Sequence, residues 1–428
     1  MPSATEIPAA GPDTSPETAI VVGAGVVGSA CAVQLARAGV RTTLVDWQDP
    51  GNGASSGNAG SLSAQSVVPI ALPGMLRQVP KWLIDPAGPL HVRWSYLPKA
   101  APWLWKWVRA SRMSTVHRSA AALRSLLDTA IEDFEELLGP EDSARLIRRH
   151  GQLLVWRSAR PDRTEAVGHQ LRELHGVEME WLTPSEIAEL EPELAPVFSR
   201  GLLLKRHGHL VDPQDAVQTL ARHFRSAGGA FVKDRVADID VCADRTVALR
   251  LDGGRSVHAH RLVIAAGAWS ARLAAKLGCR IPLETERGYH ATIPGVSGFC
   301  TRPIMDVNNS TIVTPMASGL RIAGTVEIAG VDAPPDYRRA KALLTHYHSM
   351  FSHPPVGEPT YWMGCRPSLP DSIPIIDRVE GLPNVILAFG HGHLGMTGAP
   401  ATARIVRDLF LDRPINMDIS AFRASRFA

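Results

Sequence analysis

The order of apolar and polar residues near the start of the chain predicts a strand, a helix and a second strand. Residues 19–24 are a short apolar run, residues 26–38 carry apolar positions at helical spacing, and residues 41–46 (RTTLVD) are rich in β-forming residues. Gly39 stands where a helix would end. Strand, helix and strand make a βαβ unit, which predicts a parallel sheet.

Helical and strand-like patterns continue to alternate along the rest of the chain. A helical period covers residues 114–138, strands are expected within 236–266 and 280–328, and a helix is expected over 399–411. With 428 residues the chain is long enough for two or three domains. The pattern predicts an α/β fold, with a doubly wound sheet in one domain and a mixed or antiparallel sheet in a second.

Three glycines follow the first predicted strand at the spacing G-x-G-x-x-G. They are Gly23, Gly25 and Gly28 in GAGVVG, and Asp46 closes the second strand. The first glycine allows a tight turn, the second lets the backbone approach a pyrophosphate, and the third lets helix and strand pack closely. A carboxylate at that strand end accepts hydrogen bonds from a ribose and disfavours a 2′-phosphate, so NADP fits worst. The segment predicts a Rossmann-like site for FAD or NAD; the alternative is a glycine turn that only packs.

Composition excludes several other classes of protein. With 45 basic and 42 acidic residues the formal charge is +3, so a nucleic-acid partner is not expected. The five cysteines are far apart and form no C-x-x-C pair, which argues against a zinc site and fits a reducing, cytoplasmic compartment. Residues 1–18 are expected to be a disordered tail, and no apolar run reaches the length of a membrane span.

Two later segments favour FAD over NAD. Residues 261–270 (RLVIAAGAWS) are an apolar strand ending in a small Ala-Gly pair, where the backbone can pass close to a ligand. Residues 389–406 (FGHGHLGMTGAPATARIV) are a second glycine-rich turn that leads into a helix. The positive end of that helix can stabilise negative charge at the pyrimidine edge of a reduced flavin. Without the first glycine motif, both segments would read as ordinary strand-to-helix connections.

Taken together, these segments resemble one family. The chain is similar to the FAD-dependent D-amino-acid oxidase superfamily and, more closely, to bacterial D-amino-acid dehydrogenases. The resemblance rests on VVGAGVVG with Asp46, SSGNAGSLSAQ, ERGYH, RLVIAAGAWS, GCRPSLPDSIPIID and FGHGHLGMT, in the family's order over residues 20–406. It implies a discontinuous FAD-binding domain of residues 19–89, 205–275 and 361–428, and a substrate-binding domain of residues 90–204 and 276–360.

The resemblance also implies which residues contact FAD. The pyrophosphate would lie on the N-terminal glycine motif, the adenosine ribose on Asp46 and the adenine on the backbone of Val236. The flavin ring would lie along the loop that begins at Ser55, with the turn from Gly392 over its pyrimidine edge. The full set of implied contacts is Gly23, Gly25, Val26, Val27, Gly28, Asp46, Ser55, Ser56, Asn58, Ala59, Gly60, Val236, Ala266, Gly267, Gly392, His393, Leu394, Gly395, Met396 and Thr397.

Arg366, in GCRP, is implied as the arginine that clamps the substrate carboxylate. A planar guanidinium can hold a carboxylate with two hydrogen bonds, whereas the alternative is a surface arginine beside a proline turn. Tyr289 is a second candidate, whose hydroxyl would meet the carboxylate or amine unless it is a buried structural tyrosine. His391 is expected to line the pocket. A metal role for His391 and His393 is not expected, because no third ligand stands at suitable spacing.

The implied function is FAD-dependent dehydrogenation of D-amino acids or of cyclic imino acids such as D-proline and D-hydroxyproline. The Cα hydrogen would leave as hydride to flavin N5, a step that needs orientation and a neutral amine, so no general base is assigned. Electrons would pass to a quinone or another carrier. The alternatives are a sarcosine- or glycine-type oxidase using O2, an NAD-linked dehydrogenase, and a nucleotide-binding regulator without turnover.

Two features bear on cofactor attachment and on membranes. Sarcosine-oxidase relatives attach FAD through a cysteine whose position corresponds to Gly364, one place before Cys365, so non-covalent FAD is expected. A tryptophan-rich segment suits a peripheral contact with the inner face of a membrane, and its alternative is core packing. The segment contains Trp82, Trp94, Trp103, Trp105 and Trp107 beside Lys81, Lys99, Lys106 and Arg109.

Overall fold

The βαβ unit expected at the start of the chain is present in the computed structural model. β1 (Thr18–Val22), α1 (Val26–Arg37) and β2 (Arg41–Asp46) follow one another, and Gly39 turns the chain after the helix with a φ of 85°. The predicted tail lies outside the described residues except for its last two, of which Thr18 begins β1. The structure describes residues 17–75, 90–242, 246–296, 298–352 and 357–427.

Six strands form the sheet to which β1 belongs, in the order β10-β2-β1-β14-β21-β20. All neighbours run parallel except β20, which is antiparallel to β21. β1 therefore lies in the middle of a Rossmann-like parallel sheet, as predicted. The other strands are β10 (Ala230–Lys233), β14 (Arg261–Ile264), β20 (Ile375–Val379) and β21 (Leu382–Phe389).

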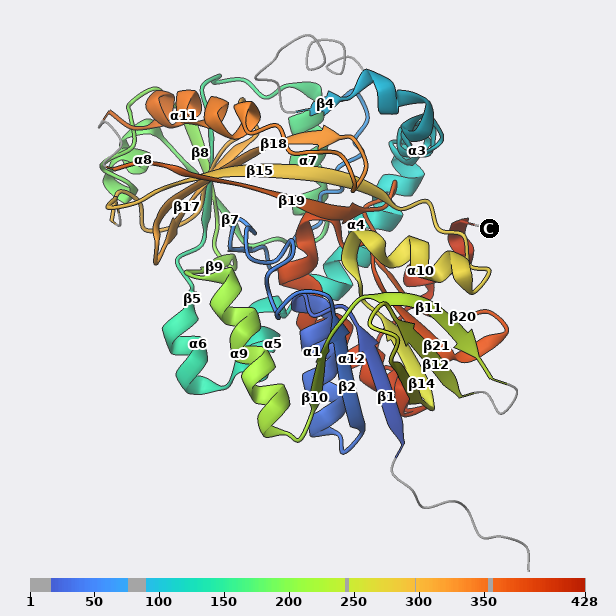
Figure 1. Cartoon of the computed structure of the whole chain (residues 1–428). Helices are drawn as coiled ribbons and strands as arrows, with labels where there is room; N and C mark the ends of the chain where they lie inside the picture. The colour runs from blue at the N-terminus through green and yellow to red at the C-terminus, as the bar shows by residue number, and fades with distance from the viewer. Residues whose placement is uncertain (1–16, 76–89, 243–245, 297, 353–356, 428) are drawn as a thin grey trace, which may run out of the picture.

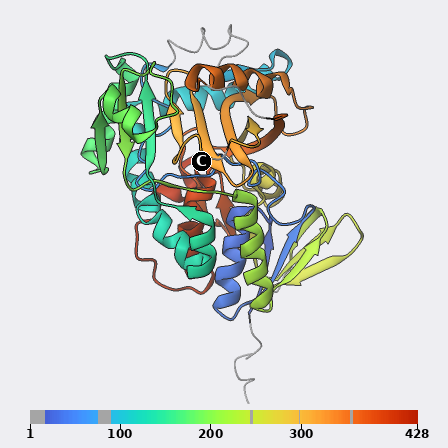
Figure 2. The same cartoon turned by 90° about the vertical axis from the view of Figure 1, so that its left-hand side faces the viewer.

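Both faces of this sheet are covered, because residues of β1 point alternately to either side and all of them from Ala19 on are buried. Ala19 and Val21 pack in a core with α1 and α12 (Gly395–Phe410). Ile20 and Val22 pack on the other face against a small antiparallel sheet, which Figure 2 shows beside the parallel one. Three strands form this small antiparallel sheet. They are β11 (Val236–Val241), β12 (Val247–Leu251) and β13 (Ser256–Ala259).

A nine-stranded mixed sheet forms the second part of the molecule and lies over one end of the parallel sheet (Figure 1). Its order is β19-β15-β18-β17-β16-β6-β8-β7, with β4 paired to β18. Most neighbours are antiparallel, whereas β16 with β6 and β18 with β4 are parallel, so the predicted mixed sheet is confirmed. Its strands are β4 (Leu90–Val92), β6 (Gln152–Trp156), β7 (Met179–Leu182), β8 (Arg200–Leu204), β15 (Glu284–Ile293), β16 (Ile304–Asp306), β17 (Thr311–Met316), β18 (Gly319–Ile328) and β19 (Thr360–Ser368).

The helical period expected over 114–138 is confirmed, and it is divided into two helices, α4 (Met113–Leu127) and α5 (Ala130–Leu138). Thr129 leaves helical geometry with φ −105° and ψ 26°, and its hydroxyl donates to the carboxylate of Asp133 at 2.9 Å. The apolar period continues across the break, so the pattern conceals it. The other helices are α3 (Leu97–Ala110), α6 (Pro140–Leu146), α7 (Arg163–Leu174), α8 (Pro184–Leu190), α9 (Pro213–Ser226), α10 (Ser270–Lys276) and α11 (Arg338–Met350).

Short elements connect the two parts. A three-stranded sheet in the order β3-β9-β5 joins the polar loop after β2 to the second part. Helices α4 and α5 contribute Leu126 and Phe134 to the same core as α1 and α12, although their segment was assigned to the substrate domain. The domain boundaries stay a prediction. The small strands are β3 (Ser61–Leu62), β5 (Ile147–Arg148) and β9 (Gly208–Leu210), and short 3-10 helices cover Trp94–Tyr96, Gly267–Trp269, Gly392–Leu394, Ser420–Phe422 and Ala424–Phe427.

Candidate active site

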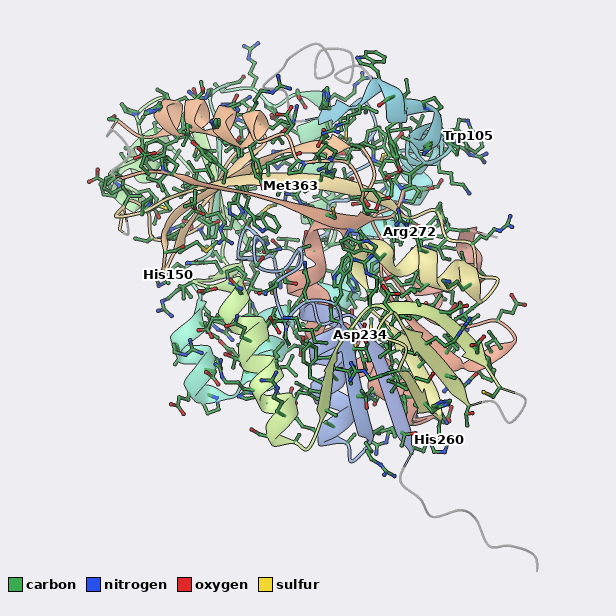
Figure 3. The ribbon with its side chains drawn as sticks, in the orientation of Figure 1. Trp105, His150, Asp234, His260, Arg272 and Met363 are labelled. Carbon is green, nitrogen blue, oxygen red and sulfur yellow. The ribbon has the colours of Figure 1, made fainter. Side chains whose placement is uncertain are left out.

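A cavity of about 880 Å³ lies between the parallel sheet and the nine-stranded sheet. Its volume is in the range of cofactor and ligand sites. Figure 3 shows Arg272 between the two sheets and Met363 on the strand above it. Most of the predicted site residues line this cavity: Gly23, Gly25, Val26, Val27, Asp46, Ser55, Asn58, Ala59, Val236, Ala266, Gly267, Tyr289, Arg366, His391, Gly392, His393, Leu394, Gly395 and Met396.

Four of the residues predicted to contact FAD do not line the cavity. Gly28 packs against the turn at Gly23, and the hydroxyl of Ser56 donates to the Gly53 carbonyl at 3.0 Å. The amide of Gly60 donates to the Asn58 side chain at 2.8 Å. The hydroxyl of Thr397 accepts from the Ser63 amide at 3.1 Å. These residues shape the loops, and a direct contact with a cofactor stays a prediction for them.

The glycine turn leaves room for a phosphate group at the start of α1. A Cβ on Gly23 would lie within 3.0 Å of the Ala265 carbonyl, and one on Gly28 within 3.0 Å of the Gly23 carbonyl. Gly25 caps α1 without a side chain, and the first turn carries no acidic residue. The free N–H groups of this turn and the positive end of the helix dipole suit a pyrophosphate. The Val26 amide is the exception, because it donates to the hydroxyl of Ser55 at 3.0 Å.

Asp46 is fixed at the end of β2 by backbone donors. Its carboxylate accepts from the Ala24 amide at 2.6 Å and from the Gln48 amide at 2.9 Å. Burial raises the pKa of Asp46, and these hydrogen bonds oppose the rise. A carboxylate has about four lone-pair sites, so acceptor capacity remains for the hydroxyls of a ribose. Val236 lines the same end of the cavity at the start of β11.

The loop after β2 is held from the nine-stranded sheet. The guanidinium of Arg321, on β18, donates to the carbonyls of Ser56 and Asn58 at 3.1 and 2.5 Å. Nδ1 of His290, on β15, donates to the Gly57 carbonyl at 3.0 Å. A Cβ on Gly57 would overlap the indole of Trp362. The segment implied to follow the flavin ring is therefore positioned by three residues of the other part of the molecule.

Three residue pairs across β15 and β19 build the floor beneath that loop. Glu286 faces Arg366, Gly288 faces Gly364, and His290 faces Trp362 in the antiparallel register. The rings of His290 and Trp362 stack with centroids 5.0 Å apart.

Both glycines of the floor are required by the neighbouring side chains. A Cβ on Gly288 would overlap the guanidinium of Arg366, and one on Gly364 would overlap the indole of Trp362. Arg366 and Trp362 therefore lie across the gap between the strands, with Arg366 turned toward the cavity that it lines.

The guanidinium of Arg366 has the carboxylate of Glu286 nearby but not in contact. Its guanidinium makes no hydrogen bond or ion pair with the described residues. Desolvation lowers the pKa of Arg366, and the nearby charge of Glu286 opposes this. Desolvation raises the pKa of Glu286, although Arg366 lowers it again. A cation on a cavity wall without a counter-charge in contact favours an anionic ligand.

The histidines of the C-terminal turn are neutral at pH 7. Desolvation lowers the pKa of His391 to about 4, and its Nε2 lies 2.9 Å from the hydroxyl of Thr402. His393 faces the cavity, where desolvation and the charge of Arg366 lower its pKa to about 4. Within the described residues, no three His, Cys, Asp or Glu side chains are grouped closely enough to hold a metal ion.

Tyr289 lines the cavity, but its hydroxyl is committed elsewhere. It donates to the carboxylate of Glu327 at 2.6 Å and accepts from the Asp336 amide at 3.1 Å. Glu327 in turn forms an ion pair with Arg287 at 3.0 Å. Only 1% of Tyr289 is exposed. These contacts agree with the alternative of a buried structural tyrosine.

The tryptophan-rich segment divides between core and surface. Trp103 and Trp107 are buried and line the cavity from α3. Trp94 is 76% exposed and Trp105 58%, and Figure 3 shows Trp105 at the outer edge of the molecule. Trp82 and Lys81 lie outside the described residues. No helix in the described ranges is long and apolar enough to cross a membrane.

Sequence reasoning did not single out several residues of the site. Arg321 and Trp362 lie within strands, and no local signal marks them, because the register of distant strands places them at the cavity. Glu286 and His290 lie inside ERGYH, where a period of two from Gly288 would have placed them on one face.

Known families and proteins match nearly the whole chain. Residues 18–409 match the model of the DAO family, described as FAD dependent oxidoreductase. The chain is 38% identical over 414 residues to a D-amino-acid oxidase of Bradyrhizobium diazoefficiens, with 95% of this chain and 98% of the relative covered. It is 30% identical over 429 residues to a D-amino acid dehydrogenase of the same organism, with 96% and 98% covered.

Solved structures share the fold at lower identity. An L-proline dehydrogenase from P. horikoshii superposes with a TM-score of 0.73 at 18% identity, covering 96% of this chain and 98% of that one. A glycine oxidase from Geobacillus kaustophilus gives 0.72 at 21% identity, covering 96% and 99%. Since the family model spans nearly the whole chain and the alignments cover 98% of each bacterial relative, the chain belongs to the DAO family of FAD-dependent oxidoreductases.

Proposed function

We propose that the protein dehydrogenates D-amino acids or cyclic imino acids such as D-proline and D-hydroxyproline, with the substrate carboxylate held by Arg366. The observation that carries the proposal is the unpaired guanidinium of Arg366 on the floor of the cavity. A carboxylate placed there gains two parallel charge-assisted hydrogen bonds in a site of low dielectric. The names of the bacterial relatives support the D configuration of the substrate.

The residues of the site orient the substrate and keep additional positive charge away from its amine. FAD supplies a two-electron acceptor when it is bound. Arg366 fixes the carboxylate end of the substrate, and the stacked His290 and Trp362 wall off the floor beside it. Neutral His393 adds no second positive charge that would repel the substrate amine. The product is a 2-imino acid, which hydrolyses to a 2-oxo acid when it is not cyclic.

Non-covalent FAD is part of the proposal. The position that corresponds to the attachment cysteine of sarcosine-oxidase relatives is Gly364, and the indole of Trp362 fills the space of a side chain there. Desolvation raises the pKa of the neighbouring Cys365, which keeps its thiol protonated at pH 7. Acid precipitation of the holoenzyme is expected to leave a colourless pellet, whereas a yellow pellet would reject this attachment.

Anaerobic reduction of the bound flavin tests the proposal. The holoenzyme is mixed without oxygen with D-amino acids, L-amino acids, N-methyl amino acids and cyclic imino acids in turn. Only the D-amino acids and the cyclic imino acids are expected to bleach the flavin absorption. Bleaching by glycine or sarcosine in preference to all D-amino acids would favour a glycine-type oxidase. No bleaching by any of them would reject the proposal.

The electron acceptor is proposed to be a quinone or another carrier, with oxygen as the second candidate. The name of the 38% identical relative favours oxygen, and the name of the 30% identical relative favours a separate acceptor. Trp94 and Trp105 are exposed, and Arg109 lies 4.6 Å above the Trp105 ring; exposed aromatic and cationic side chains of this kind suit peripheral contact with lipid. Turnover measured with and without oxygen decides which electron acceptor is used. Flotation with anionic vesicles decides whether the protein binds lipid.

A further inference from the structure

A second unpaired guanidinium lies in the same cavity, far from the first. Among the described residues, four arginines line the cavity: Arg172, Arg235, Arg272 and Arg366. Two of them have acidic partners, Asp252 at 3.7 Å for Arg235 and Asp332 at 2.6 Å for Arg272. Like that of Arg366, the guanidinium of Arg172 forms no ion pair or hydrogen bond within the described part of the chain.

Arg172 retains its charge although no acid compensates it. It stands in the last turn of α7, and desolvation alone lowers its pKa to about 10, so the guanidinium is protonated at pH 7. Leu154 and Leu204, on β6 and β8, line the same arm of the cavity. An isolated charge beside apolar walls is unfavourable until an anion joins it.

The amide oxygens of Gln65 and Gln152 near Arg172 are already occupied. The amide oxygen of Gln65 accepts from the Glu178 amide at 3.2 Å, and that of Gln152 accepts from Ser61 at 2.8 Å. Their amide nitrogens make no hydrogen bond to the described residues, and both side chains line the cavity. Gln65 also has a left-handed backbone with φ 59°, a strained conformation for a residue with a side chain.

His207 completes this arm of the cavity, here called the Arg172 arm and defined by Arg172, Gln65, Gln152 and His207. Its Nδ1 donates to the Gln152 amide oxygen at 3.0 Å, and its buried Nε2 has no partner within the described residues. Desolvation and the charge of Arg172 lower the pKa of His207 to about 3, so the ring is neutral. Arg172 is therefore the charged group of this arm.

We propose that the Arg172 arm binds a second carboxylate, carried by the side chain of the substrate. This inference rests on the proposed function and narrows it to D-amino acids with an extended acidic side chain. Arg366 lies on β19 and the Arg172 arm borders β6, five strand spacings away in the sheet order. Five spacings amount to about 24 Å between the two strands, and both guanidinium groups line the cavity. An acid on a flexible chain can engage both guanidinium groups, whereas a small neutral side chain reaches only one.

Binding of unreactive acids to the holoenzyme tests the arm without turnover. Linear dicarboxylates from malonate to suberate are titrated against the flavin spectrum, each beside the monocarboxylate of equal chain length. At one or two chain lengths the dicarboxylate is expected to bind at least tenfold more tightly than the monocarboxylate of the same length. The Arg172→Met variant is expected to lose this excess. Equal affinities at every length in the unaltered enzyme would overturn the inference, whatever the variant does.

Kinetics provides a second readout with a matched control. The ratio of kcat/KM for D-2-aminoadipate and D-glutamate over D-glutamine is expected to fall about 30- to 100-fold in Arg172→Met, because one partner of a desolvated charge pair is removed. Arg163→Met, an exposed position at the first residue of the same helix, is expected to keep the ratio. A ratio unchanged in Arg172→Met would overturn the inference.

Two further measurements distinguish this inference from a purely structural role of Arg172 and from a failure of the proposed function. The melting temperature of Arg172→Met is expected to equal or exceed that of the parent, since an uncompensated charge is removed; a fall of several degrees would make Arg172 a structural residue and count against the inference. If neutral D-amino acids bleach the flavin without any preference for acidic ones, the inference fails and the proposed function stands. If no amino acid bleaches it, the proposed function fails, and the dicarboxylate titration still decides whether Arg172 binds an acid.

Discussion

The two ends of the cavity are built in different ways. At the start of α1, the site consists of backbone: the turn at Gly23, the uncapped helix end at Gly25 and the amides that hold Asp46. On the nine-stranded sheet, it consists of side chains, chiefly Arg366 and Trp362 over two glycines. We propose that the first end recognises the pyrophosphate, which is the same in every dinucleotide, and that the second end recognises the substrate, which differs between enzymes.

The two ends of the cavity should therefore respond differently to substitutions. A backbone site depends on the absence of side chains, because a carbon added at Gly23 or Gly28 collides with a backbone carbonyl. A side-chain site depends on individual groups, which can be exchanged while the sheet keeps its register. Substitutions at the first end should therefore remove the cofactor or the fold, and substitutions at the second should change turnover and leave the cofactor bound.

The largest effect is expected at the glycine turn. Gly28→Ala places a carbon within 3.0 Å of the Gly23 carbonyl, so α1 must shift away from β1. Overpacking of this kind costs about 1–3 kcal/mol or more, and the phosphate site is lost with it. The variant is expected to be purified without flavin or to be insoluble, as measured by the ratio of flavin to protein absorbance.

Gly39→Ala is the matched control in the same βαβ unit. Gly39 also has a positive φ, but nothing lies within 4 Å of an added Cβ. The strain costs about 1–2 kcal/mol of unfolding free energy, while FAD should remain bound. If Gly28→Ala retains full flavin, the close-approach argument at this end is wrong.

The next largest effect is expected at Arg366. Arg366→Met removes the cation that faces the cavity, and kcat/KM for D-amino acids should fall by a factor of about 30 to several thousand, the equivalent of about 2–5 kcal/mol. Flavin content should equal that of the parent, in contrast to the glycine variant. Arg250→Met, on the exposed side of β12, should change neither quantity. Loss of flavin from Arg366→Met would erase the distinction between the two ends.

The same distinction explains what could be predicted from the sequence. The glycine turn, α1 and Asp46 lie within 28 consecutive residues of one βαβ unit, so local spacing determines their geometry. Arg366 was found only through the resemblance to a family, because its neighbours Glu286 and Gly288 come from a strand far away in sequence. Arg321 and Arg172 carried no signal at all, since only the folded sheet brings them to the cavity.

Acidification should weaken the fold through the buried histidines between the two ends. The pKa of His391 falls from 6.5 to about 4 by desolvation, so the unfolded chain binds the proton more tightly. Its contribution to stability is complete above pH 6.5 and is lost as the pH falls toward 4, by about 3 kcal/mol in total. Unfolding measured by denaturant between pH 7 and 4.5 should show this decline.

A histidine variant isolates that contribution. His391→Gln cannot take up a proton, so the slope of unfolding free energy against pH should decrease by up to about 1.4 kcal/mol per pH unit below pH 6. His258→Gln replaces an exposed histidine on β13 and provides the comparison. Parallel pH profiles for the parent and His391→Gln would contradict the assignment of a neutral His391.

The smallest effect is expected where the two ends are tied together. Arg321 belongs to the nine-stranded sheet, yet its guanidinium donates to the carbonyls of Ser56 and Asn58 in the loop implied to follow the flavin ring. Arg321→Met removes both bonds without adding bulk, and bonds to a charged donor contribute about 1.5–3 kcal/mol each at most. The freed loop can still close over FAD, so only part of that energy is lost from FAD binding. The Kd for FAD is expected to rise about tenfold. It is measured by fluorescence quenching while FAD is titrated into the apoprotein. Arg222→Met, an exposed arginine on α9, should leave the Kd unchanged. A Kd equal to the parent's in Arg321→Met would mean that the loop is positioned by the cofactor end alone, and that the two ends are built independently.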